Sequence, residues 1–327
     1  MLPQPTVDPV SSTTAQAIVL PTARHVRRPL HRPRVTAYAL LAPSAVFLLG
    51  FTYWPVLQVL AGALTVHAFG GTAHWGLGNF TRLLADPRFA HAVANNLIYA
   101  IGTIVPSLVL ALALALGLRE TTRVSAVLRT LLVLPLLIPL VAAASLFVFI
   151  FLPGAGLLDY YLARLGPSPF GMAQLSLGQT NWLGNPSLAL GSIIAITVWK
   201  NTGYYMLFFL AGLAGIPQEM LDAARIDGAG AWARLRHVTL PLLGPTLAFV
   251  LVIALLNALT QVDHVVVMTQ GGPSDSTMLL LYYIYQQAAQ NYDVGLASAA
   301  TVVSVAVLFA LSVASLRSLE RGIHYEA

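Results

Sequence analysis

The sequence predicts an all-α, polytopic membrane protein with six transmembrane helices and both termini in the cytoplasm. Hydrophobic residues make up 57% of the 327-residue chain and charged residues only 9%, whereas soluble domains carry roughly 25% charged residues. Six apolar segments reach the length of about 20 residues that a helix needs to cross a bilayer. Because backbone amides find no water partner in lipid, these segments are expected to be helices.

The six apolar segments lie at about 37–64, 94–118, 126–152, 187–213, 239–262 and 295–316. The gaps between them are polar or rich in glycine and proline. Pro55, Pro106, Pro135 and Pro139 fall within or near the segments, and they are expected to kink helices that neighbouring helices then support.

The basic residues predict the orientation. Thirteen of the 17 lysines and arginines fall in the first tail, in alternate loops and after the last segment, and only Arg82, Arg88 and Arg164 fall in the opposite loops. The positive-inside rule therefore places both termini in the cytoplasm. The remaining basic residue, Lys200, lies inside the fourth segment.

The chain divides into two short tails and a membrane domain. Residues 1–35 are polar, contain several prolines and end in a cluster of arginines, which predicts a disordered cytoplasmic tail. A secretory signal is disfavoured because the following apolar run is too long and has no small-residue cleavage pattern. Residues 36–316 form the six-helix domain and residues 317–327 a second cytoplasmic tail. The first tail could contact anionic lipid headgroups, and nucleic-acid binding has almost no support.

The composition excludes several kinds of chemistry. The absence of cysteine excludes disulfides, thiolate metal sites and cysteine nucleophiles. The eight histidines show no metal-ligand spacing, so we expect solvated histidines and no metal site. Lys200 is the only lysine and follows Val198 and Trp199, so no phosphate-binding loop of the Gly-x-x-x-x-Gly-Lys type exists. The sequence therefore predicts no catalytic residues, and any ATP hydrolysis must take place on another polypeptide.

The loop between the fourth and fifth segments, residues 214–245, has a helix-turn-helix pattern. Pro217 suits the first turn of a helix, and Glu219 and Asp222 favour its positive end. Gly228 permits the turn that ends this helix. A second short helix would place Trp232 and Leu235 on one face, before Pro241 and Pro245 lead back into the membrane. An amphipathic surface helix without further function is the alternative.

This loop resembles the coupling loop of bacterial ABC importer permeases, in which a Glu-Ala-Ala triplet is followed by Asp-Gly-Ala. The matching residues are Asp222-Ala223-Ala224, Asp227-Gly228-Ala229, Leu240-Pro241 and Pro245. Asp222 replaces the usual glutamate and keeps a carboxylate one methylene shorter. The resemblance implies that the loop contacts the ATPase through Glu219, Asp222, Ala223, Ala224, Asp227, Gly228, Ala229, Trp232, Leu240 and Pro241.

Further motifs narrow the resemblance. Trp199-Lys200, Gly271-Gly272-Pro273 and Asn79-Phe80 resemble the carbohydrate-type permeases, and residues 275–286 and 319–325 resemble those for sn-glycerol 3-phosphate or glycerophosphodiesters. This implies a type I ABC importer permease fold in the bacterial inner membrane. It also implies as partners a second homologous permease, two copies of an ATPase that binds ATP and magnesium, and an extracytoplasmic solute-binding protein.

Polar residues inside the segments are candidates for the substrate pathway, because ionisable and polar groups at membrane depth are expensive. Lys200 could attract a phosphate or a sugar hydroxyl, and its alternatives are a structural ion pair or a snorkelling side chain. Asn257 and Gln261 lie four residues apart on one helical face, although polar contacts between helices are equally compatible with them. The candidates are Lys200, Asn201, Tyr204, Tyr205, Asn257, Gln261 and Asn96, together with Asp263, which is expected at the outer mouth.

Three other functions compete with the import of a glycerol-phosphate compound. The first is a permease for a neutral oligosaccharide such as trehalose or maltose. A gradient-driven secondary transporter is the second, and it usually needs intramembrane carboxylates, of which we find none well inside a segment. The third, a membrane-embedded enzyme, needs titratable groups that converge at one depth, and the sequence does not show them.

Overall fold

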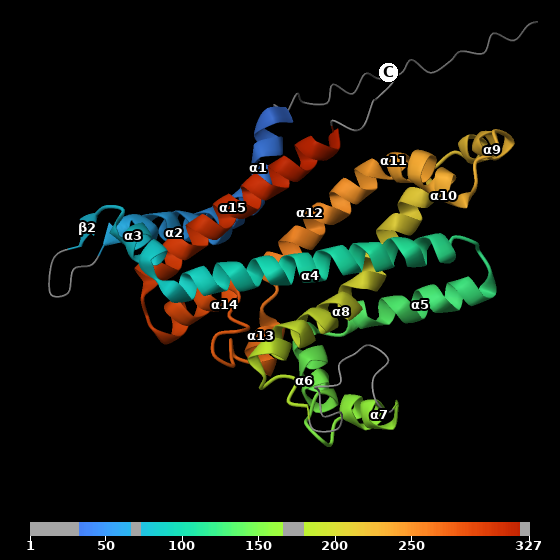
Figure 1. Ribbon diagram of the computed structural model, residues 1–327. Coiled ribbons are helices and arrows are strands. Elements are labelled where there is room, and N and C mark those ends of the chain that lie inside the picture. The colour runs from blue at the N-terminus through green and yellow to red at the C-terminus, as the bar shows by residue number, and fades with distance from the viewer. Residues whose placement is uncertain (1–32, 67–72, 166–179, 321–327) are drawn as a thin grey trace, which may run out of the picture. The chain divides into compact units, whose positions relative to one another are not determined.

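The computed structural model describes residues 33–66, 73–165 and 180–320 (Figure 1). Both predicted tails therefore lie almost wholly outside the described residues. The chain forms two compact units, residues 1–54 and 55–327. In the first unit, the described part consists of α1 (Pro33–Leu48) and the π-helical turn η1 (Leu49–Tyr53).

The second unit is built almost entirely of helices. Its longer helices are α2 (Trp54–Leu64), α4 (Pro87–Gly117), α5 (Arg123–Leu137), α6 (Leu140–Ile150), α8 (Pro186–Ala214), α12 (Gly244–Thr260) and α15 (Val294–Glu320). Its shorter elements are α3 (Gly78–Ala85), α7 (Leu157–Leu165), α9 (Gln218–Ile226), α10 (Ala231–Arg234), η2 (Leu235–Thr239), α11 (Leu240–Leu242), α13 (Asp263–Met268), α14 (Leu280–Tyr285) and η3 (Gln286–Gln290). One antiparallel ribbon pairs β1 (Thr65–Val66) with β2 (His74–Trp75), a small departure from the predicted all-α chain.

All six predicted apolar segments are helical, and five of them are helices long and apolar enough to span a membrane. These five are Ala37–Leu64, Pro87–Gly117, Pro186–Ala214, Gly244–Met268 and Val294–Ala314. The segment at 126–152 differs from the prediction of one kinked helix, because it divides into α5 and α6, which meet at 98°. The second span begins seven residues before the predicted start, because Pro87 suits a first helical turn and the Asp86 carboxylate caps it by accepting a hydrogen bond from Arg88 N at 2.9 Å.

The core of the second unit lies around α4 and α8, which pack along each other (Figure 1). The core contains several alanines and large aromatic residues, of which Tyr99, Tyr205 and Phe209 are almost fully buried. At Gly203 the backbone of α8 comes so close to α5 that a Cβ would overlap the Leu132 carbonyl oxygen. Small residues of this kind let helix backbones approach each other, which is how helices associate in lipid.

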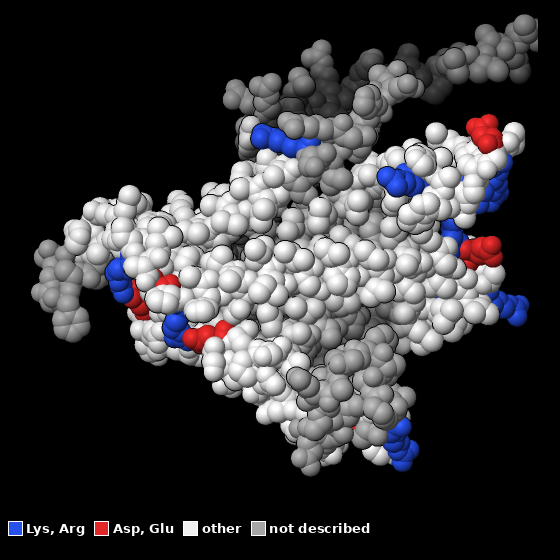
Figure 2. Space-filling view, in the orientation of Figure 1, with Lys and Arg blue, Asp and Glu red and all other residues white. Residues whose placement is uncertain are grey.

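Figure 2 shows how the charges are distributed on one face of the molecule. Within the second unit, the coloured atoms gather over the α9–α10 region and the α4–α5 loop, and again over the α3–α4 end, whereas the long shaft of α4 between them is white. Many large apolar side chains on the helices are exposed, among them Val105, Val109 and Leu131. An apolar band between charged ends is the surface that a bilayer requires.

Candidate functional site

The loop between α8 and α12 begins with the helix-turn-helix that its sequence predicts. Pro217 is the N-cap residue of α9, and Glu219 lies in the first turn, where a carboxylate complements the helix dipole. The chain then continues through α10, η2 and α11 into α12 with hardly an interruption. Pro241 and Pro245 lie in the first turns of α11 and α12, where a missing amide hydrogen costs no helical hydrogen bond.

Gly228 ends α9 in the way that the sequence predicts. Its φ of +76° lies in the left-handed region, which only glycine adopts routinely. Gly228 N donates to Arg225 O at 3.0 Å, and Ala229 N donates to Ala224 O at 2.9 Å. These two bonds form a Schellman motif, so the turn after Asp227 has a single defined geometry.

The Asp222 carboxylate is held against its own helix. It accepts hydrogen bonds from Arg225 Nη1 at 2.8 Å and from Gln218 Nε2 at 3.2 Å, and about half of the Asp222 side chain stays exposed. Ala223 is exposed and Ala224 half-buried. The first helix of the loop therefore presents a carboxylate that is already paired beside a smooth surface of small side chains.

The loop exposes three large apolar side chains on a polar stretch of chain. The exposed fractions are 48% for Met220, 86% for Ile226 and 70% for Trp232. The sequence analysis selected only Trp232 of these, because Met220 and Ile226 follow no helical pattern that sets them apart. Leu235 lines a hollow of about 300 Å³ between the loop and the end of α4, whereas Trp232 is exposed. Apolar side chains exposed in this number are typical of a docking surface.

The α4–α5 connection supports this loop from beside it. Arg119 and Arg225 line the hollow together, with Arg234 on its α10 side. The Arg129 guanidinium donates to the carbonyls of residues 118, 119 and 120, and so binds the backbone of the turn that follows α4. Basic side chains therefore surround the loop, in agreement with the blue atoms seen there in Figure 2.

The predicted pathway residues fall into two groups. Tyr205 in α8 and Asn257 in α12 meet, with Asn257 Nδ2 donating to the Tyr205 hydroxyl at 3.1 Å. Asn201 is buried one turn before Tyr205 in α8, and Tyr204 is half-buried. Gln261 is half-buried at the interruption between α12 and α13, and Asp263 is exposed just after it.

Asn96 and Lys200 have their polar atoms bound within the fold. Asn96 is buried and its Oδ1 accepts from Leu280 N at 3.3 Å. The Lys200 ammonium donates to the carbonyls of Pro135, at 3.1 Å, and of Ile138, with Leu136 O at 3.5 Å. No carboxylate among the described residues pairs with it.

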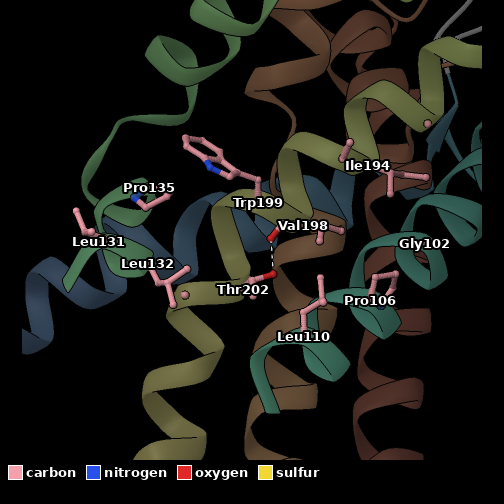
Figure 3. Close-up of a pocket in the computed structure, with 13 residues that line it drawn as sticks. Gly102, Pro106, Leu110, Leu131, Leu132, Pro135, Ile194, Val198, Trp199 and Thr202 are labelled. Atoms are coloured by element: carbon pink, nitrogen blue, oxygen red, sulfur yellow. Dashed lines mark hydrogen bonds between the residues drawn. The ribbon is translucent and has the colours of Figure 1, made fainter. Parts of the chain in front are cut away.

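An apolar groove lies beside Lys200, between α4, α5 and α8 (Figure 3). Its volume is about 530 Å³. Pro106, Leu131 and Trp199 line it with several small residues, and the Thr202 hydroxyl inside it donates to its own helix at Val198 O, 2.6 Å away. The groove offers no free polar group, so it suits lipid or another helix better than a sugar or a phosphate.

The sequence analysis missed a buried polar network between α4, α8 and α13. The Tyr99 hydroxyl lies 3.0 Å from both Thr197 Oγ1 and His264 Nε2. His264 is fully buried, so its prediction as a solvated histidine is wrong. That prediction failed because α13 turns the residue after a helix interruption into the core. Within the described residues, no group of three metal-ligating side chains exists.

A second set of contacts, at the other end of α4, joins it to α14 and to the loop before α14. Arg88 forms a bidentate pair with Asp275 at 3.1 and 3.2 Å, and the Tyr283 hydroxyl donates to Asp86 at 2.6 Å. Burial, followed by the contact with Asp86, raises the pKa of the Tyr283 phenol, so the phenol stays a donor. These non-local contacts leave no pattern in the sequence.

Comparisons with known proteins agree with this geometry. Residues 107–325 match the family described as the binding-protein-dependent transport system inner membrane component. The chain is 32% identical to the sn-glycerol-3-phosphate transport system permease protein UgpA of Brucella abortus, over 89% of this chain and 97% of that protein. It is also 32% identical to the UgpA protein of Escherichia coli strain UTI89, over 91% and 99% of the two chains.

The fold is similar to that of solved transporters. A chain of a bacterial ABC transporter involved in the import of the acidic polysaccharide alginate superposes with a TM-score of 0.75, at 23% identity, over 89% of this chain and 96% of that one. The family model matches residues 107–325, and two UgpA proteins are each 32% identical to the chain. Both findings assign the chain to the same family. The chain belongs to the binding-protein-dependent transport inner membrane components, which are the multi-pass, non-catalytic permease subunits of ABC importers.

Proposed function

We propose that this permease carries sn-glycerol 3-phosphate or a glycerophosphodiester, and that residues 214–245 receive the force of ATP hydrolysis. The observation that carries the coupling role is the rigidly capped turn at Gly228 beside exposed Met220, Ile226 and Trp232. A lever needs a fixed shape and a docking surface, and this loop has both. The names of the relatives support the substrate class.

The proposed contacts with the ATPase are the residues that match the family motif. They are Glu219, Asp222, Ala223, Ala224, Asp227, Gly228, Ala229, Trp232, Leu240 and Pro241. ATP and magnesium would bind to two copies of that ATPase, with a second homologous permease and an extracytoplasmic solute-binding protein completing the importer. In this arrangement the loop and both termini face the cytoplasm, which the distribution of arginines supports.

The proposed pathway passes the Tyr205–Asn257 pair. Asn201 and Tyr204 lie beside it on α8, and Gln261 and Asp263 follow it along α12 and α13. Hydroxyl and amide groups at this depth suit a polyol backbone. The backbone partners of Lys200 support a different role for that residue, argued below.

Measuring ATP hydrolysis by the complete complex in proteoliposomes tests the substrate. The compounds are sn-glycerol 3-phosphate, a glycerophosphodiester, trehalose and maltose. Each is added together with its binding protein on the side of the proteoliposome membrane that the extracytoplasmic face of the complex occupies. We expect stimulation by the two phosphorylated compounds. Stimulation by the neutral disaccharides alone would refute the substrate, and uptake driven by an ion gradient without ATP would refute the coupling role as well.

A pair of variants separates the coupling role from simple damage to the loop. Asp222→Glu restores the longer carboxylate of the family motif, and we expect it to retain stimulated ATP hydrolysis. Trp232→Ala removes an exposed side chain that contributes little to the fold, yet we expect it to weaken the binding of the ATPase. Unchanged binding and uptake in Trp232→Ala would show that this surface does not dock.

A further inference from the structure

Two prolines create a local problem at the bend between α5 and α6. In a continuous helix the carbonyl of residue 135 accepts from the amide of residue 139, but residue 139 is a proline and has no N–H. Because the chain turns by 98° here, the carbonyls of Leu136 and Ile138 also lose regular partners. Ile138 N donates to the Pro135 carbonyl at 3.3 Å, a long contact for an amide donor. An unsatisfied carbonyl at membrane depth costs several kcal/mol, so the Leu136 and Ile138 oxygens need a donor from elsewhere, and Pro135 O can accept a second one.

Lys200 supplies that donor. Its side chain leaves α8 and places the ammonium 3.1 Å from Pro135 O and within hydrogen-bond distance of Ile138 O. Lys200 is only 8% exposed. A cation also suits the C-terminal end of α5, where the helix dipole is negative. One ammonium thus meets both the hydrogen-bonding and the electrostatic demand of the bend.

The residues around Lys200 on α8 hold the two sides of the bend. Trp199 packs edge-on against Phe147 of α6, with ring centroids 5.1 Å apart. Gly203, nearly one turn further on, lets α8 touch the backbone of α5 at Leu132. The helix α8 therefore holds α6 through Trp199, the bend through Lys200 and α5 through Gly203.

The position of α6 matters beyond the bend, because α6 packs against α13. The helix α13 follows the interruption at Gln261–Val262 and carries His264, which joins Tyr99 of α4. The outer parts of two interrupted spans, α6 and α13, thus contact each other directly (Figure 1). A shift of α6 would move α13 and the start of the proposed pathway.

We propose that Lys200 is a positioning residue for transport: its ammonium holds the α5–α6 bend and thereby sets the position of α6 against α13. The role is independent of which compound is carried. It replaces the direct contact with substrate that the sequence suggests for this lysine.

Spin labels can test this directly, since the chain has no native cysteine. Cysteines at Leu131 in α5 and Leu146 in α6, which are 54% and 58% exposed, would carry the labels in the full complex in lipid. We expect a narrow distance distribution with Lys200, a broadened or shifted one with Lys200→Met, and recovery with Lys200→Arg. Leu207→Met, on an exposed position of the same helix, is the matched control.

Transport kinetics give the second measurement. The loss of one charge-assisted hydrogen bond corresponds to a fall of about tenfold in the population of the bent form. We therefore expect Lys200→Met to lower the maximal uptake rate about tenfold and to leave the half-saturating concentration of the loaded binding protein unchanged. Lys200→Arg should restore most of the rate. An unchanged label distance would overturn the proposal. So would a raised half-saturating concentration with normal distances, which would identify a substrate contact.

Pro139→Ala keeps the proposal testable where Lys200→Met alone fails to assemble. The substitution gives residue 139 an N–H that can bond the Pro135 carbonyl. We expect Lys200→Met with Pro139→Ala to assemble better than Lys200→Met, because the Pro135 carbonyl then gains its regular helical donor in addition to the 3.3 Å contact with Ile138 N. Equal yields of the two would contradict the capping role. If the unsubstituted complex shows no ATP-dependent uptake, the proposed function is contradicted. The label distances would still test the role of Lys200 in the bend.

Discussion

Replacing Gly228 by valine is the sharpest perturbation of the loop between α8 and α12. Gly228 has a φ of +76°, and no described atom lies within 4 Å of the point where its Cβ would sit. The cost is therefore conformational and not steric. An L-residue in the left-handed region costs about 1–2 kcal/mol, and a β-branched residue is an outlier there. The population of loops with the Schellman turn should fall about 5- to 30-fold.

The assay is uptake and stimulated ATP hydrolysis by the complete complex in proteoliposomes. Gly230 gives a matched control, because it also has open space at its Cβ but an ordinary φ of −64°. We expect Gly228→Val to lower coupled uptake and Gly230→Val to leave it nearly unchanged. Gly228→Asn should retain more activity than Gly228→Val, because asparagine tolerates the left-handed region. Equal losses in Gly228→Val and Gly230→Val would refute the reasoning, since backbone strain would then not explain the effect.

Two further substitutions test the packing of α8 against α5 and the contact of α14 with the start of α4. Gly203→Ala places a Cβ on the Leu132 carbonyl oxygen, and such overpacking costs about 1–3 kcal/mol. We therefore expect the detergent-solubilised protein to unfold at a lower temperature. Gly191→Ala, where no described atom lies within 4 Å of the added Cβ, should leave the unfolding temperature unchanged. Tyr283→Phe removes the donor to Asp86 at 2.6 Å, and we expect a loss of about 1–3 kcal/mol in the free energy of unfolding, measured by denaturant titration; no change would mean that water replaces the phenol.

The features that the sequence predicts well are those with local causes. Six apolar segments appear as helices because their length and composition suffice. The turn at Gly228 appears because glycine and the preceding small residues determine it within a few positions. The bend at Pro139 is predicted only as a kink; neither its angle of 98° nor the contact of Pro135 with Lys200, 65 residues away, follows from the local sequence.

The features that the sequence misses have distant partners. His264 looks like a loop histidine until α13 packs against α6 and turns it towards Tyr99. Met220 and Ile226 stand out only once their exposure is known. The Tyr205–Asn257 contact confirms that two candidate residues meet, but each was selected for its polarity alone, which cannot separate a pathway from a contact between helices.

Lys200 belongs to a wider pattern of side chains that donate to backbone carbonyls near helix ends. Side chains from other elements bind carbonyls at, or just after, the ends of three helices of the second unit. Asn79 donates to the last carbonyls of α2, Arg129 to the carbonyls of residues 118–120 just after α4, and Lys200 to the last carbonyls of α5. The final carbonyls of every helix lack intrahelical donors, and water is scarce inside a membrane protein.

These capping side chains lie between 9 and 65 residues from the carbonyls to which they donate, so no local sequence motif predicts them. In the sequence they look like isolated polar residues in apolar surroundings, which is also how a substrate contact looks. The two roles make different demands, however. A cap needs a helix that ends, and Pro139 supplies that end for α5. An intramembrane lysine in a chain with a proline-broken span should therefore be matched first to the carbonyls that the break frees.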